Sequence, residues 1–97
     1  MSVEKEIEQL YIRQSQVTGR YTTAKARRKA WLALGMALRG LLEAYAENPD
    51  IVAQQVERLN EILSENDDRY KKLSELEEKA QSELMQIETM LRVRREP

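Results

Sequence analysis

Hydrophobic positions recur along the first half of the chain at alternating spacings of three and four residues, from Val3 to Tyr45. The series is Val3, Ile7, Leu10, Gln14, Val17, Tyr21, Ala24, Arg28, Trp31, Gly35, Leu38, Leu42 and Tyr45. Such a heptad repeat places one seam along one side of an α-helix. It predicts one long helix over residues 2–47, continuous through Gly19 and capped by Ser2.

The second half of the chain repeats this spacing after a break at residues 48–50, which read Asn-Pro-Asp. Proline cannot continue a helix, and Asn or Asp can cap the next one. The second seam is Val52, Val56, Leu59, Leu63, Asn66, Tyr70, Leu73, Glu77, Ala80, Leu84, Ile87 and Leu91. We therefore expect a turn at 48–50 and a second helix over 51–94. Because the connection is so short, the two helices must run antiparallel.

The two seams mirror each other about the turn and predict an all-α fold, an antiparallel two-helix hairpin of coiled-coil type, in a single domain over residues 1–97. Residues at equal distance from the turn should come opposite one another. This places Arg13 opposite Glu83 and Trp31 near Asn66. A polar residue in the seam, such as Asn66, is a common means of fixing the register between two helices.

The stretch from Ala30 to Ala46 is apolar on nearly every side, with Arg39 and Glu43 as its only charges. A helix that is hydrophobic all round must be covered all round, and one facing helix is too little cover. We therefore expect the half of the hairpin next to the turn to dimerise into a four-helix bundle, or to dock a different protein. The expected interface residues are Trp31, Leu32, Leu34, Met36, Leu38, Leu41, Leu42 and Tyr45.

The composition argues against catalysis. Charged residues make up 34% of the chain and hydrophobic residues 41%, which is typical of long helices and coiled coils. The chain has no histidine and no cysteine, so it lacks the commonest general base, the commonest metal ligand and any thiol nucleophile. We expect no enzyme activity, no cofactor and no metal site.

Two further observations concern membranes. The apolar stretch is 17 residues long and is interrupted by Arg39 and Glu43, whereas a bilayer-spanning helix needs about 20 mostly apolar residues. The N-terminus has no cationic start followed by an apolar run, as a signal peptide would. The sequence thus predicts a cytoplasmic protein that does not insert into a membrane.

Charge is segregated along the chain. Residues 9–42 contain seven basic and no acidic residues, whereas residues 43–97 contain fourteen acidic and eight basic ones. The basic side chains expected to contact a partner are Arg13, Arg20, Lys25, Arg27, Arg28 and Lys29. They could bind an acidic protein surface, where arginine is enriched, or the phosphates of a nucleic acid.

Together these features predict a non-enzymatic protein-interaction module, such as an adaptor, a small chaperone or an inhibitor of a larger complex. It would act through an apolar helix face and a basic flank. The alternative is a nucleic-acid-binding helical dimer that uses the basic stretch of the first helix. In that case affinity should fall steeply with salt.

Overall fold

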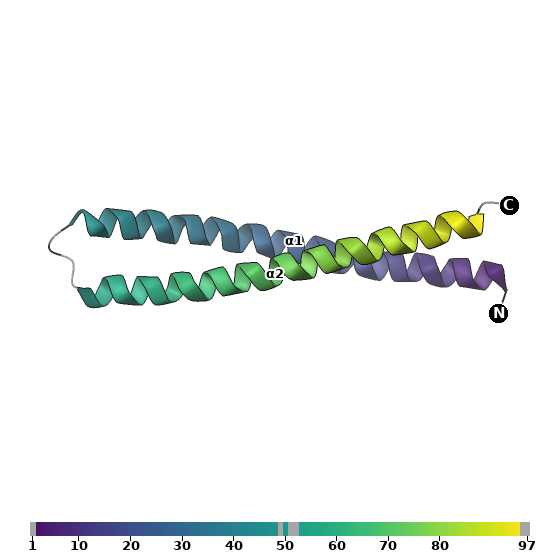
Figure 1. The fold of residues 1–97 in the computed structure, drawn as a ribbon, viewed down its shortest axis with the longest axis horizontal. Helices are drawn as coiled ribbons and strands as arrows, with labels where there is room; N and C mark the ends of the chain where they lie inside the picture. The colour runs from purple at the N-terminus through teal and green to yellow at the C-terminus, as the bar shows by residue number, and fades with distance from the viewer. Residues whose placement is uncertain (1, 49, 51–52, 96–97) are drawn as a thin grey trace. The chain divides into compact units, whose positions relative to one another are not determined.

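The structure, a computed structural model, describes residues 2–48, 50 and 53–95. It has two helices, α1 over Val3–Ala46 and α2 over Ala53–Arg95, packed in a hairpin (Figure 1). The predicted all-α hairpin is therefore confirmed, and α1 runs through Gly19 without interruption. The predicted start of the second helix, at residues 51 and 52, and the proline of the turn lie outside the described residues.

Polar side chains stabilise the start of α1 and the turn. The Ser2 hydroxyl accepts a hydrogen bond from the Lys5 amide at 3.3 Å, and the Ser2 carbonyl accepts one from the Glu6 amide at 3.1 Å. These contacts make Ser2 the N-cap, as predicted. At the other end, Asn48 Oδ1 accepts a hydrogen bond from the Asp50 amide at 3.1 Å. This is the local bond by which an asparagine stabilises a turn.

Burial follows the predicted seams. Among the seam positions of α1, Val3 is exposed and all the others are buried or half-buried. In α2, every seam position from Val56 to Leu91 is buried or half-buried. Each helix thus buries a narrow strip against the other, which is the geometry that a strict heptad seam produces.

The chain divides into two compact units. Met1–Lys25 and Ser74–Pro97 form one, here called the terminal unit, and Ala26–Leu73 forms the other, here called the turn unit. In each unit, a segment of α1 runs antiparallel to a segment of α2 (Figure 1).

The terminal unit contains an apolar core. Its buried members are Val17, Ala80, Ile87 and Leu91, and Ile7, Leu10, Tyr21 and Leu84 pack against them. Val17 is the most deeply buried, with 0% of its surface exposed. Burying a Val, Ile or Leu side chain is worth about 1.5–3 kcal/mol, so this cluster is the main source of stability in the unit.

Charged contacts join the two helices at the edges of this core. Arg13 forms an ion pair with Glu83, as the mirrored seams predict. Arg94 Nε lies 3.1 Å from Glu6 Oε2, so the first turns of α1 contact the last turns of α2. Partly exposed pairs of this kind contribute about 0–1 kcal/mol each, so they fix the register more than they add stability.

In the turn unit, by contrast, the described contacts between the two helices are mainly polar. Asn66 is only 2% exposed, and its Nδ2 donates a hydrogen bond to the Trp31 carbonyl at 3.1 Å. The prediction that Trp31 lies near Asn66 is therefore correct. Arg39 and Asp67 form an ion pair of 3.0 Å, and the Arg69 guanidinium lies 5.0 Å from the centre of the Trp31 ring.

Candidate interaction surface

The eight predicted interface residues fall into two groups. Trp31, Leu38, Leu42 and Tyr45 belong to the seam and are half-buried against α2. The other four are exposed, with 39% of the surface of Leu32 accessible, 44% of Leu34, 65% of Met36 and 41% of Leu41. The first group is therefore part of the hairpin contact, and the second group is available to a partner.

The four exposed residues do not form one patch. At about 100° per residue, Leu34 and Leu41 lie on one side of the α1 seam, and Leu32 and Met36 lie on the other. Arg39 follows Leu32 by two helical turns and so lies on the same side of the seam as Leu32. Its ion pair with Asp67 is therefore on the Leu32 side. The predicted interface therefore consists of two strips, separated by the seam.

The strip that contains Leu34 and Leu41 is wider than the strip that contains Leu32 and Met36. Ile62 of α2 is half-buried and precedes a seam position, as do Leu34 and Leu41 in α1, so all three lie on the side of the seam away from Arg39 and Asp67. Three alanines at heptad spacing extend this strip on α1; they are Ala30, Ala37 and Ala44, all exposed. We call Leu34, Leu41, Ile62 and these alanines the apolar face.

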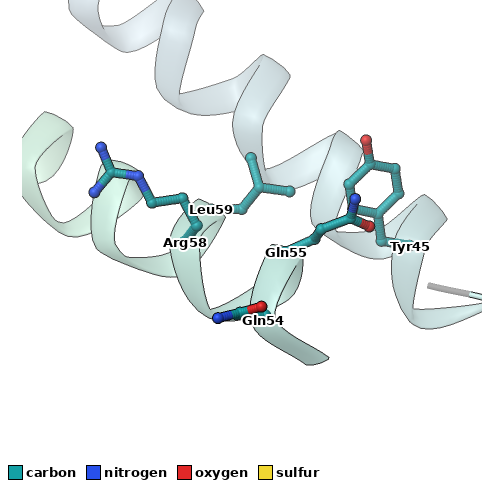
Figure 2. Close-up of a pocket in the computed structure, with 5 residues that line it drawn as sticks. All are labelled: Tyr45, Gln54, Gln55, Arg58 and Leu59. Atoms are coloured by element: carbon teal, nitrogen blue, oxygen red, sulfur yellow. The ribbon is translucent and has the colours of Figure 1, made fainter. Parts of the chain in front are cut away.

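A hollow of about 310 Å³ opens between the two helices close to the turn. It is lined by Tyr45, Gln54, Gln55, Arg58 and Leu59. Figure 2 shows Leu59 pointing from α2 towards α1 and Gln55 lying near the Tyr45 ring. Two seam residues, Tyr45 and Leu59, thus line a shallow depression that is open to solvent.

Packing in the turn unit is correspondingly incomplete. Within the part of this unit that the structure describes, the buried residues are Gly35 and Asn66. None of its described apolar side chains is fully buried. The seam leucines on both helices remain half-buried. A segment of this size with so little core needs additional cover to be stable.

The six predicted basic contact residues also differ in their surroundings. Arg13 is paired with Glu83, the Lys25 ammonium lies 5.7 Å from the centre of the Tyr21 ring, and Arg28 is half-buried. The remaining three are exposed and form no ion pair with any residue that the structure describes; they are Arg20, Arg27 and Lys29.

Arg20 lines an open groove of about 500 Å³ in the terminal unit. The groove is formed by Arg13, Arg20, Lys79, Ser82, Glu83 and Gln86. Three cations and two neutral hydrogen-bonding side chains could bind a carboxylate or a phosphate. Glu83 already neutralises Arg13, so Arg20 and Lys79 carry the charge available to a ligand.

The terminal unit also exposes apolar side chains that the sequence analysis does not assign to an interface. Outside the seam they are Tyr11, Ile12, Leu76, Met85, Met90 and Val93. Met85 and Met90 line a shallow groove of about 410 Å³ together with Ser82, Gln86 and Thr89. All five lie off the seam of α2, so a search restricted to the heptad spacing passes over them.

Neither chemistry nor similarity to known proteins assigns a function. Among the described residues, no group of three or more His, Cys, Asp or Glu side chains could hold a metal ion. Neither helix, over the residues described, is long and apolar enough to cross a membrane. Comparison of the chain with protein-family models, with curated proteins and with solved structures gives no match.

Proposed function

We propose that this protein is a non-enzymatic interaction module whose docking surface is the apolar face of the turn unit. The observation that carries the proposal is the lack of a buried apolar core in the described part of that unit, although it contains the most apolar stretch of the chain. A partner helix packed on Leu34, Leu41 and Ile62 would complete a bundle and bury the half-exposed seam beneath them. An adaptor, a small chaperone and an inhibitor of a larger complex would all act in this way.

The basic groove of the terminal unit is a separate candidate contact. Arg20 and Lys79 face an open groove with no neutralising partner among the described residues, so an acidic segment can bind there. Electrostatic contacts of this kind speed association and select the partner more than they increase affinity. The groove itself therefore favours an acidic protein segment as its ligand.

Nucleic acid is the alternative ligand for the basic groove. Its phosphates would be bound by the same two cations, and Glu83 in the groove, paired with Arg13, does not distinguish phosphate from carboxylate. Fluorescence anisotropy with a labelled oligonucleotide decides between the two ligands. Binding at low ionic strength that weakens steeply with salt and is lost in Arg20→Ala would favour nucleic acid. No binding at low salt leaves the acidic protein partner.

Site-specific photo-crosslinking tests the proposed docking surface. A photo-reactive amino acid is placed at Leu41 in the full-length chain, and the chain is irradiated in an extract of the cells that produce it. Ile12 is the matched control, because it is equally apolar and 53% exposed but lies away from the seam. We expect adducts of defined mass from position 41, none from position 12, and loss of the adducts in Leu34→Asp. Equal labelling at both positions, or none at position 41, would contradict the proposal.

A further inference from the structure

We propose that the partner on the apolar face is a second copy of this chain, docked with its α1 antiparallel to the α1 of the first. This inference rests on the proposed docking surface and names its occupant. A two-fold axis would pass beside Ala37 and Leu38. Leu34 of each copy would then pack against Leu41 of the other, and the two hairpins would form a four-helix bundle.

Charge along α1 matches this arrangement. Arg27 precedes the apolar face and Glu47 follows it, and neither forms an ion pair with a residue that the structure describes. Both are about ten residues from the axis, so an antiparallel dimer brings each Arg27 level with Glu47 of the other copy, twice by symmetry. A parallel dimer would instead place Arg27 beside Arg27, which like-charge repulsion disfavours.

The end of α1 supplies an independent argument. A helix carries partial negative charge at its C-terminus, and basic residues in the last turn normally offset it. The last turn of α1 contains Glu43 and no basic residue, whereas that of α2 contains Arg92, Arg94 and Arg95. Arg27 of a second copy would supply the missing positive charge at the end of α1. The same pairing thus gives Arg27 and Glu47 an opposite charge and also offsets the negative end of the α1 dipole.

The available area is sufficient for a dimer. The α1 segment of the turn unit, Ala26–Ala46, is about 30 Å long, and two helices side by side are about 20 Å wide. A contact of this length and width buries about 600 Å² on each copy and about 1,200 Å² in total. This area is at the lower limit of the range for stable complexes. Ala30, Ala37 and Ala44 lie along the α1 edge of the face, where their small side chains permit close approach of the two α1 helices.

Cysteine cross-linking tests the arrangement directly, because the natural chain has no cysteine. In the antiparallel dimer Ala37 lies beside Ala37 of the other copy, whereas the two Ala30 residues are about 20 Å apart, beyond the reach of a disulfide. We expect Ala37→Cys to form a covalent dimer on mild oxidation and Ala30→Cys to form none. A mixture of Ala30→Cys and Ala44→Cys chains should give the mixed disulfide.

Charge reversal provides a second readout. Arg27→Glu and Glu47→Arg should each weaken the dimer about 5- to 10-fold, since each removes two opposite-charge contacts, and the double variant should regain most of the affinity. Equal cross-linking at Ala30→Cys and Ala37→Cys would show a parallel dimer and overturn the inference, as would a double variant weaker than both single ones.

The inference and the proposed function can fail separately. If the cysteine variants do not cross-link and the photo-adduct at position 41 has the mass of a different protein, the second copy is ruled out and the interaction module stands. If no adduct forms at position 41 and the cysteine variants remain monomeric, both proposals are overturned.

Discussion

The side-chain oxygen of Asn66 lies 2.7 Å from the position that a Cβ atom on Gly35 would occupy. Asn66 is 2% exposed and is held by its hydrogen bond to the Trp31 carbonyl, one helical turn before Gly35. The absence of a side chain at Gly35 therefore leaves the space that the Asn66 side chain occupies. Sequence alone places Gly35 on the seam, and the structure shows that its missing side chain admits a polar group from the other helix.

Gly35→Ala should destabilise the hairpin. The new methyl group would force Asn66 to rotate and lose its bond to Trp31, at a cost of about 1–3 kcal/mol that outweighs the roughly 1 kcal/mol gained in helix propensity. Gly19 and Gly40 are matched controls, because a Cβ at either position meets nothing within 4 Å. Gly19→Ala and Gly40→Ala should stabilise the fold by about 0.5–1 kcal/mol. Urea unfolding followed by circular dichroism measures all three; stabilisation by all three would contradict the close contact.

Asn66→Asp should introduce a pH-dependent instability. The substitution keeps the shape but buries a carboxylate close to the Trp31 carbonyl, so burial raises the pKa of the introduced group above its ordinary value of about 3.9. The folded state then binds the proton more tightly than the unfolded one. The variant should be least impaired below pH 4 and lose stability relative to the natural chain as pH rises. A pH-independent difference in unfolding free energy would show that position 66 is not buried.

Val17→Ala should lower the free energy of unfolding by about 1–2.5 kcal/mol, since it removes two methyl groups from a fully buried position. Val93→Ala makes the same chemical change at a side chain that is 64% exposed. It should change stability by less than about 0.5 kcal/mol. Similar losses in the two variants would mean that the core of the terminal unit is elsewhere.

The Arg13–Glu83 ion pair should contribute little and should depend on salt. Arg13→Gln should cost about 0.5 kcal/mol at low ionic strength and almost nothing in 1 M NaCl, where charges are screened within about 3 Å. Arg20→Gln is the control, because Arg20 forms no ion pair with the described residues. A double-mutant cycle with Glu83→Gln isolates the pair. A loss that persists at high salt would indicate packing rather than charge.

The sequence was sufficient for the helices and for the seam. Three-four spacing identified Val17, Ile87 and their neighbours as the buried strip, because an antiparallel pair of helices leaves one face to bury on each. Mirroring about the turn likewise placed Arg13 opposite Glu83 and Trp31 near Asn66. These relationships depend on backbone periodicity, which the sequence carries.

Side-chain detail was beyond the sequence. The stacking of Arg69 on Trp31 and the fit of Asn66 against Gly35 depend on rotamers and on the distance between the helices. Periodicity alone places Leu32 and Met36 across the seam from Leu34 and Leu41. The ion pair between Arg39 and Asp67, on the Leu32 side, is a side-chain contact that only the structure shows.

The mass of the chain in solution tests the central claim most directly. Sedimentation equilibrium of the full-length protein should give twice the chain mass of 11.4 kDa. Leu41→Asp should reduce this to the chain mass, because it places a charge in the centre of the apolar face, and Ile12→Asp should leave the dimer intact. A stable helical monomer of 11.4 kDa at every concentration would contradict the account of the apolar face as a dimer interface.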